Sequence, residues 1–233
     1  MLILAFETSA KAGSVALMEG GKLLAEDYQN TGLTHSQTLL SMAEALLRHC
    51  GKSPKDVKAV AVAAGPGSFT GVRIGVAAAK GFAWGAQLPC CGVSTLEAMA
   101  RNLGIWEGLV VCAMDARRSQ VYNAVFEAHE GVLTRRCPDR AISLADLGEE
   151  LKIETKPIFL VGDGSILCYN TLKDVVSGLI LPPEHRMHQR AAGVALVAHA
   201  MLEAGVSCDA GSLEPNYLRL SQAEREKLER NKP

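Results

Sequence analysis

Apolar runs that end in a carboxylate and then double back occur twice in the chain. Leu2 to Phe6 is apolar and leads into Glu7, and Leu109 to Met114 is apolar and leads into Asp115. Each carboxylate is followed by a turn and a second strand-like run, which is typical of a β-hairpin. The returning strands are expected at 14–18, with a third antiparallel strand at 22–28, and at 120–126. A pattern repeated about half a chain apart indicates two similarly built halves.

Helical periodicity dominates the sequence between the two hairpins. A helix is predicted from Thr34 to Cys50, because its leucines and alanines share one face and Thr34 and Gln37 have capping-box spacing. A buried strand at 58–64 leads into a glycine-rich loop and a second helix to about Gly85. The other predicted elements are a helix from Ser94 with Glu97 as its capping partner, a strand at 157–161 and an alanine-rich helix at 190–204. The chain is therefore predicted to be an α/β protein.

The hairpin patterns also predict where the chain divides. We expect an N-terminal domain at 1–104, to which the helix at 190–204 returns, a smaller domain at 105–189, and a C-terminal tail at 205–233. The charged run from Glu224 to Pro233 is expected to be frayed.

Composition narrows the classes of function. The 233 residues are 48% hydrophobic, which is enough for a packed core, and the formal net charge is −1. Without a basic excess, any contact with RNA is expected to be local or made through a partner. No apolar stretch reaches membrane-spanning length, so we expect a cytoplasmic protein. The seven cysteines include no C-x-x-C pair, which favours reduced thiols over a disulfide framework or a zinc site.

The loop Gly65-Pro66-Gly67-Ser68-Phe69-Thr70-Gly71 lies between a predicted strand and a predicted helix. Glycines there would allow a phosphate to approach a helix N-terminus. However, Val72 stands where a Walker loop has lysine, and the glycine spacing does not fit a dinucleotide fingerprint. A tight turn that serves helix packing is the alternative, and both interpretations stay open at this stage.

Glu7, Thr8 and Ser9 follow the first strand and could surround a magnesium phosphate, with Asp115 opposite. The alternative is that Glu7 caps its own hairpin turn. No metal site is expected from the scattered histidines, and no nucleophile has a base at a recognisable spacing. His35, in the first turn of its helix, is expected to face solvent or to make a local hydrogen bond.

The first two long helices could present an apolar surface to another protein, although packing against their own sheet is the simpler alternative. The second helix has small residues at helical spacing, which permit close backbone approach. The candidate partner-interface residues are Leu39, Leu40, Ala43, Leu46, Leu47, Gly71, Val72, Gly75, Ala78, Ala79 and Phe82.

Three segments together resemble the TsaB (YeaZ) family. They are Phe6-Glu7-Thr8-Ser9, Thr34-His35-Ser36-Gln37 and, most specifically, Gly65 to Gly75. The run Pro215-Asn216-Tyr217-Leu218-Arg219 is also similar, so the resemblance covers about residues 1–220. It implies two ribonuclease-H-like halves with mixed sheets, as in the actin, sugar kinase and chaperone ATPase group.

The resemblance further implies a pseudo-enzyme that binds and activates the related catalytic subunit TsaD, which transfers threonylcarbamoyl to N6 of the adenosine beside the tRNA anticodon. The two metal-binding histidines of TsaD correspond to Thr95 and Met99 here, and its second phosphate loop corresponds to Asp115-Ala116-Arg117-Arg118. Threonine and methionine cannot replace two imidazoles as ligands. The ATPase TsaE is an implied partner, tRNA an indirect one, and a homodimer is expected when the chain is alone.

Two enzyme classes remain as alternatives to the partner subunit. One is a phosphotransferase of the acetate or sugar kinase type, which would use Glu7, Asp115 and the loop at Gly65. The other is a glycoprotease-like metallopeptidase, which the missing histidines disfavour. The expected cofactor is none, or weakly bound ATP or ADP at a vestigial site of Glu7, Thr8, Ser9 and Asp115, alone or completed by a partner.

Overall fold

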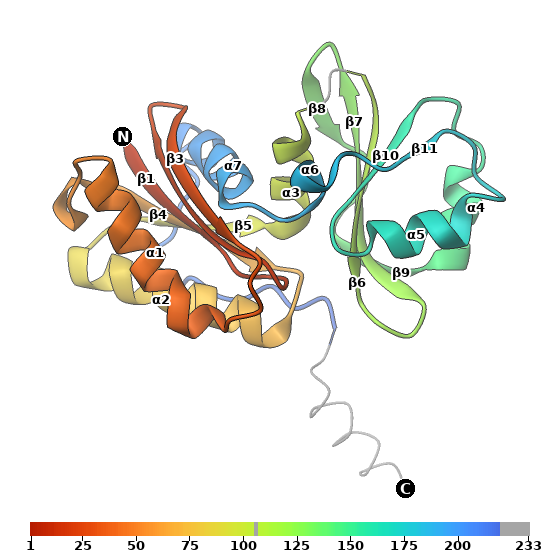
Figure 1. Ribbon diagram of the computed structural model, residues 1–233. Helices are drawn as coiled ribbons and strands as arrows, with labels where there is room; N and C mark the ends of the chain where they lie inside the picture. Colours follow the sequence, from red (N-terminus) through yellow and green to blue (C-terminus); the bar gives the residue numbers. More distant parts are fainter. Residues whose placement is uncertain (105–106, 220–233) are drawn as a thin grey trace, which may run out of the picture.

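The structure is a computed structural model that describes residues 1–104 and 107–219, and it contains two mixed sheets flanked by helices (Figure 1). The first sheet has the order β3-β2-β1-β4-β5. Its strands are β1 (Leu2–Glu7), β2 (Gly13–Glu19), β3 (Lys22–Gln29), β4 (Ala59–Gly65) and β5 (Cys90–Ser94). Strand β1 is antiparallel to β2 and parallel to β4, and β4 is parallel to β5.

The second sheet repeats this arrangement at its centre. Strand β6 is antiparallel to β7 and parallel to β10, as β1 is to β2 and β4. The sheet order is β11-β10-β6-β7-β8, and β9 pairs with β7. The strands are β6 (Gly108–Asp115), β7 (Gln120–His129), β8 (Val132–Arg135), β9 (Arg140–Ser143), β10 (Ile158–Val161) and β11 (Leu179–Ile180). The expectation of two similarly built α/β halves with mixed sheets is confirmed.

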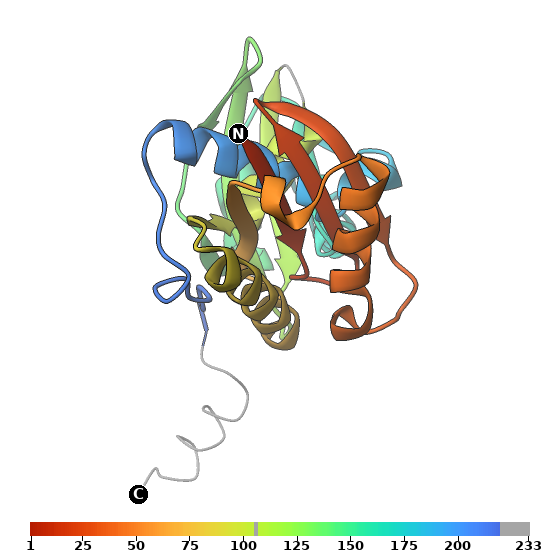
Figure 2. The same cartoon turned by 90° about the vertical axis from the view of Figure 1, so that its left-hand side faces the viewer.

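Helices cover both faces of the first sheet. Helices α1 (His35–His49) and α2 (Phe69–Ala86) lie side by side on one face, and α7 (Ala191–Glu203) lies on the other (Figures 1 and 2). Alternate residues of β1 therefore enter two different cores: Phe6 packs with α1 and α2, and Ala5 packs with α7. Burial on both faces explains why β1 is apolar at successive positions instead of alternating with polar residues.

Helix α3 (Thr95–Leu103) joins the two halves. Its Leu96 and Met99 pack with Phe126 of the second sheet, while Ala98 contributes to the core beneath α7. The contact with α7 is close, since a Cβ atom added to Gly193 would lie 2.1 Å from the Ala98 carbonyl oxygen. The remaining helices are a short 3-10 turn (Pro54–Asp56), α4 (Leu144–Leu151), α5 (Ser165–Leu172) and α6 (Glu184–Met187).

The strands and long helices predicted from the sequence occur within a residue or two of their expected positions, except that β7 continues three residues beyond the expected 120–126. The segment from 130 to 156, which yielded no prediction, contains β8, β9 and α4. The two sheets comprise residues 2–94 and 108–180, with α7 returning to the first. The exact domain boundaries stay a prediction, and the run from Glu224 to Pro233 lies outside the described residues.

Two details at the start of α1 differ from expectation. The Thr34 side chain makes no capping hydrogen bond, so the predicted capping box with Gln37 is wrong; the Gln37 amide instead donates to the Thr34 carbonyl at 2.9 Å. His35 is neither solvent-facing nor locally bonded, because its Nε2 donates to the Ala10 carbonyl at 2.8 Å. This bond ties the helix to the β1–β2 turn. At α3 half of the predicted capping box is present: the Glu97 amide donates to Ser94 Oγ at 3.2 Å, whereas the Glu97 side chain accepts from Arg135.

Candidate functional site

Glu7 is fully buried at the end of β1, on the side of the first sheet that faces α7. Its Oε1 accepts a hydrogen bond from the Ser9 amide at 2.6 Å, whereas Oε2 has no partner among the described residues. Burial raises the pKa of Glu7 to about 7, although the Ser9 hydrogen bonds act in the opposite direction. A carboxyl group in this position is readily protonated near neutral pH.

A third carboxylate, which the sequence analysis did not single out, lies near Glu7. The charge of Asp163, just after β10, helps to raise the pKa of Glu7, and the charge of Asp115 helps to raise that of Asp163. Partial loss of hydration is the main cause of the raised pKa of Asp163, although the residue as a whole is exposed. The strand ends of the two halves therefore bring Glu7, Asp115 and Asp163 into one region. Asp163 could have been found from the sequence by the pattern that identified Glu7 and Asp115, which is a carboxylate directly after or near the end of an apolar strand.

Hydrogen bonds to backbone hold two of these three carboxylates in tight turns. Asp115 Oδ1 accepts from the Arg117 amide at 2.7 Å, in the same way that Glu7 accepts from Ser9. Arg117, Arg118 and Ser119 all have positive φ between 56° and 63°. Three successive non-glycine residues in this conformation make a costly turn. The expected capping role of Glu7 is thus observed, while a magnesium phosphate at the same carboxylates stays untested.

The glycine-rich loop packs directly against Thr8 and Ser9. A Cβ atom added to Gly71 would lie 2.0 Å from the Thr8 carbonyl oxygen, and one added to Gly67 would lie 2.6 Å from that of Ser9. The Ser68 amide also donates to the Ser9 carbonyl at 2.7 Å. Backbone of the same chain therefore occupies the space that the missing side chains leave free. This is the close packing that the sequence left as the alternative to phosphate binding.

The C-terminal segment covers the loop from the other side. The Asn216 amide donates to the Ala64 carbonyl at 2.6 Å, and a Cβ atom added to Gly65, where φ is +121°, would lie 2.4 Å from the Asn216 carbonyl oxygen. One residue further, Tyr217 stacks on Phe69 with ring centroids 4.2 Å apart. Its hydroxyl oxygen accepts from Arg73 at 2.8 Å. The loop is thus enclosed between the β1–β2 turn and the last described residues.

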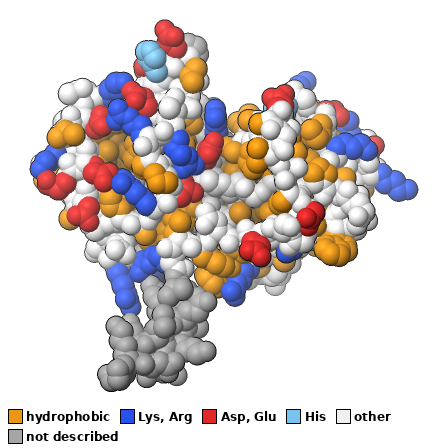
Figure 3. Space-filling view, turned by 180° about the vertical axis from the view of Figure 1, so that it is seen from behind, with side chains coloured by type: hydrophobic (Ala, Val, Ile, Leu, Met, Phe, Trp, Pro, Cys, Tyr) orange, Lys and Arg blue, Asp and Glu red, His pale blue; other side chains and the backbone are white. Residues whose placement is uncertain are grey.

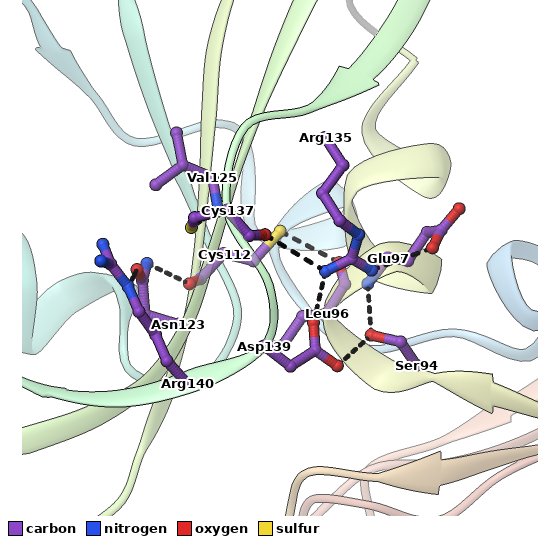
Figure 4. Close-up of polar contacts among 10 residues, drawn as sticks. All are labelled: Ser94, Leu96, Glu97, Cys112, Asn123, Val125, Arg135, Cys137, Asp139 and Arg140. Atoms are coloured by element: carbon purple, nitrogen blue, oxygen red, sulfur yellow. Dashed lines mark hydrogen bonds and ion pairs between the residues drawn. The ribbon is translucent and has the colours of Figure 1, made fainter.

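A network of polar contacts fixes the second half against α3 (Figure 4). Arg135 donates to Asp139 Oδ1 at 2.6 Å and to Glu97 Oε2 at 2.9 Å, and Ser94 Oγ donates to the other oxygen of Asp139 at 2.6 Å. The guanidinium group also lies 4.6 Å from the ring centroid of Phe126. Because Ser94 and Glu97 belong to the first half of the chain, the network sets the position of the two halves.

No group of histidine, cysteine, aspartate or glutamate with the spacing of a metal site occurs among residues 1–104 and 107–219. Thr95 and Met99 are both buried on α3, where Met99 packs in the core between the halves. The Thr95 hydroxyl has no hydrogen-bond partner within the described part of the chain. These two side chains therefore offer one hydroxyl and one thioether, a poor set of ligands for a hard cation.

The predicted partner-interface residues fall into two groups. Leu40 is 59% exposed, and Ala78 and Phe82 are half-buried. The others lie inside the first half, where they pack against the sheet or against the β1–β2 turn: Leu39, Ala43, Leu46, Leu47, Gly71, Val72, Gly75 and Ala79. These buried residues support the two helices and are not open to a partner in this conformation.

Charges of both signs are interspersed on the face shown in Figure 3, which has no extended basic field. This distribution agrees with the near-neutral composition of the chain. None of the helices in the described ranges combines the length and the hydropathy that a bilayer crossing demands.

Two α/β halves of one design, with carboxylates at the strand ends between them, define the fold of the actin, sugar kinase and chaperone ATPase group. A family model described as TsaD, tRNA N6-adenosine threonylcarbamoyltransferase, matches residues 29–227. The tRNA threonylcarbamoyladenosine biosynthesis protein TsaB of Bacillus subtilis is 34% identical over 233 residues, covering 100% of both chains. TsaB of Escherichia coli is 34% identical over 222 residues, which cover 94% of this chain and 95% of that protein. The chain belongs to the TsaB family, within the wider TsaD group.

Solved structures agree with this assignment. YeaZ from Pseudomonas aeruginosa matches with a TM-score of 0.77 and 26% identity, covering 93% of this chain and 99% of that one. The ethanolamine utilization protein EutJ from Carboxydothermus hydrogenoformans matches with a TM-score of 0.50 and 14% identity, covering 84% of this chain and 89% of that one. The second likeness concerns the fold alone.

Proposed function

We propose that this chain is a non-catalytic subunit of tRNA threonylcarbamoyladenosine biosynthesis, which binds TsaD and activates its transfer of threonylcarbamoyl to N6 of the adenosine beside the anticodon. The role in this biosynthesis follows from the full-length similarity to TsaB proteins. The observation that supports the non-catalytic part is the packing of the glycine-rich loop, because the backbone of Thr8 and Ser9 fills the space beside Gly71 and Gly67 where a phosphate would otherwise approach.

The side chains at the positions of the TsaD metal ligands and second phosphate loop support the same conclusion. Thr95 and Met99 are weak ligands, and Arg117 and Arg118 occupy the second hairpin turn where close phosphate approach would favour glycine. A metallopeptidase would need a ligand set that these residues do not supply. A phosphotransferase would need the loop at Gly65 to open, against its contacts with Ser9 and Asn216.

The partner surface we propose for TsaD is the outer side of α1 and α2. Leu40 is exposed there, and on α2 the exposed residues Ala77 and Gly81 are small enough for a partner helix to approach closely. The same surface would serve a homodimer when TsaD is absent. TsaE would join the heterodimer, and contact with tRNA would come through the complex.

Binding of ATP or ADP by the chain alone is expected to be weak or absent. Glu7, Thr8 and Ser9 are fully buried, and only Asp115 of the vestigial site is exposed. A nucleotide would therefore bind at Asp115 and the adjacent surface, or at a site completed by a partner. Titration calorimetry with magnesium ATP measures this directly, and tight binding by the isolated chain would favour a phosphotransferase.

The proposal is tested by reconstitution of tRNA threonylcarbamoyl formation from purified TsaD, TsaE and the adenylate-forming enzyme, with and without this chain. Product that requires the chain, together with co-elution of the chain and TsaD in size-exclusion chromatography, would support the proposal. Equal product without the chain, and no complex, would refute it.

The variant Leu40→Arg tests the proposed surface. A charge at this exposed position leaves the fold intact but places an unpaired guanidinium group in the interface, which costs on the order of 2–5 kcal/mol of binding. We expect at least a tenfold loss of TsaD affinity with an unchanged melting temperature. The matched control is Ile166→Arg on α5 of the second half, where the native side chain is similarly exposed at 55%. Equal effects of both variants would show that the outer side of α1 is not the interface.

A further inference from the structure

Two cysteines far apart in the sequence form a backbone bridge at the edge of the first sheet. The Cys90 amide donates to the Cys208 carbonyl at 2.8 Å, and the Cys208 amide donates to the Cys90 carbonyl at 2.9 Å. Residues that exchange both hydrogen bonds in an antiparallel pair have Cα atoms about 5.5 Å apart. This separation falls inside the range of about 4.4–6.8 Å found for disulfides.

The two side chains point to the same side of the sheet. Cys90 and Cys208 both pack against the core beneath α1 and α2, whereas Cys91 belongs to the core beneath α7 on the opposite face. Successive residues of a strand face opposite ways, so Cys91 cannot reach Cys208 as Cys90 does. The pairing of Cys90 with Cys208 is thus set by the register of the bridge.

Solvent reaches one of the two thiols. Cys90 is fully buried, but Cys208 is only half-buried and lines an open pocket of about 740 Å³ together with Trp84, Leu88 and Asp209. A pocket of this size admits one half of a small disulfide such as oxidised glutathione. Cys208 is accordingly the thiol that an oxidant meets first.

We propose that Cys90 and Cys208 form a reversible disulfide, which makes this pair a redox modification site. It lies near the start of the C-terminal segment, residues 205–219, which follows α7. In the reduced state the segment is attached to β5 by the two backbone hydrogen bonds of the bridge. In the oxidised state the same contact is covalent.

The reaction is a thiol–disulfide exchange with oxidised glutathione. The Cys208 thiolate attacks one sulfur of oxidised glutathione and releases one glutathione thiolate, forming a mixed disulfide. The Cys90 thiolate then attacks the Cys208 sulfur and releases the second glutathione. Two protein thiols are oxidised, one glutathione disulfide is reduced to two thiols, and the protons on the protein thiols pass to the buffer and the leaving thiolates.

Oxidation would fix the position of the segment that covers the glycine-rich loop. Leu213 is buried in the first core, Asn216 bonds to Ala64, and Arg219 donates to the Ala116 carbonyl of the second half at 2.7 Å. Figure 2 shows this segment, in blue, descending from α7 along the first half. A covalent bond at Cys208 holds the start of this path and so limits how far the segment can move away.

The test is incubation of the full chain with oxidised glutathione, followed by thiol counting and peptide mapping. We expect two of the seven thiols to be lost, with residues 81–101 linked to residues 191–219 after tryptic digestion. A disulfide that closes a long loop should raise the melting temperature by about 4 °C or more, and dithiothreitol should reverse the shift.

Serine variants identify the partners. Cys90→Ser should stop the reaction at a glutathione adduct on Cys208, and Cys208→Ser should prevent the loss of both thiols. Cys91→Ser and Cys137→Ser are the matched controls, in which the bond should still form. Burial raises the pKa of Cys90 to about 11 and also raises that of Cys208, so the exchange rate should increase about tenfold per pH unit between neutral pH and about pH 9.

Four outcomes would overturn the proposal. They are a bond from Cys208 to Cys91, a stable glutathione adduct on the unmodified chain, disulfide-linked dimers on a non-reducing gel, and retention of all thiols. Circular dichroism of each variant in the reduced state excludes unfolding as the cause.

Discussion

The Glu7 side chain lies where sheet and helices exclude water, and its Oε1 accepts a hydrogen bond from the Ser9 amide. Loss of hydration outweighs the hydrogen bonds from Ser9 and Thr8, so the pKa of Glu7 rises to about 7 from its ordinary 4.5. The sequence identified Glu7 as the residue to examine, because a carboxylate after five apolar residues is unusual. It could not indicate whether the oxygens meet a cation or the interior of the protein, since that depends on α7 and the second half.

The burial of Glu7 predicts a pH dependence of stability. The folded state holds the proton more tightly than the unfolded state, so this group's contribution is fully present below about pH 4.5 and is lost as the pH rises through about 7. A shift of this size corresponds to about 3 kcal/mol. Glu7→Gln should remove this part of the dependence and leave the variant more stable than the unmodified chain at about pH 8.

Urea unfolding across the pH range measures this effect. Asp163 also has a raised pKa and acts in the same direction, so Asp163→Asn is the companion variant that separates the two carboxyl groups. An identical pH slope for Glu7→Gln and the unmodified chain would show that Glu7 is ionised in the folded state throughout.

The glycines of α2 predict opposite effects of the same substitution. Gly71→Ala would push a methyl group to 2.0 Å from the Thr8 carbonyl oxygen, and neither backbone can move freely. We expect a loss of at least about 2 kcal/mol in unfolding free energy. Gly81→Ala on the same helix meets nothing within 4 Å and should stabilise the chain by roughly 0.5–1 kcal/mol. Urea denaturation of both variants is the measurement, and equal destabilisation would contradict the close packing of the loop.

At the scale of the element, α1 and α2 show what a helical pattern specifies. Periodicity located both helices and their apolar residues. It did not separate the apolar residues that pack in the core from those that are exposed to solvent. Leu46 is 6% exposed and packs in the first core, while Leu40 on the same helix is 59% exposed. The helical pattern alone suggests Leu46→Arg and Gly75→Arg as probes of a partner surface. In the structure both variants place a charge inside the first half, so they are expected to unfold it.

A pair of alanine variants distinguishes the core-packing leucine of α1 from the exposed one. Leu46→Ala should cost about 2–5 kcal/mol of unfolding free energy, since it leaves a cavity between α1 and the sheet. Leu40→Ala should change stability by no more than about 0.5 kcal/mol. Thermal unfolding measured by circular dichroism distinguishes the variants, and comparable losses would mean that Leu40 is covered in solution, as in a homodimer.

Elements with strong local signals were predictable, and those defined by distant contacts were not. The apolar run of β1 and the leucines of α1 carry their own pattern, whereas β9 is four residues long and gains its place by pairing with β7. The Thr34 side chain makes no capping bond, and the start of α1 is held by a contact distant in sequence, from His35 to the β1–β2 turn. The enclosure of the glycine-rich loop depends on Asn216, which is about 150 residues from Gly65 in the sequence, so no local pattern could predict this contact.

At the scale of the whole molecule, α3 and the Arg135 network hold the two halves together. Asp139 has a side chain only 9% exposed, so it depends on Arg135 and Ser94 for compensation of its charge. Arg135→Met should cost about 3 kcal/mol, because it leaves a largely buried carboxylate without its cation. Arg136→Met is the matched control: its ion pairs with Glu127 and Glu154 are more exposed, and their loss should cost no more than about 1 kcal/mol.

Urea unfolding of both variants, with hydrogen exchange of the α3 amides, tests this prediction. Faster exchange in α3 only for Arg135→Met would locate the effect at the junction of the halves. Similar losses for both arginines would mean that the network contributes no more than surface ion pairs do.

The return of α7 to the first sheet has a consequence for how the chain is made. The second sheet uses one continuous stretch, residues 108–180, but the first needs α7 to cover Ile3, Ala5 and Met18. On the ribosome the first half thus stays incomplete until residue 203 has emerged, after the whole second sheet has been synthesised. The usual order, in which the N-terminal unit folds first during translation, is then reversed, and the nascent first half is the part that requires protection from aggregation.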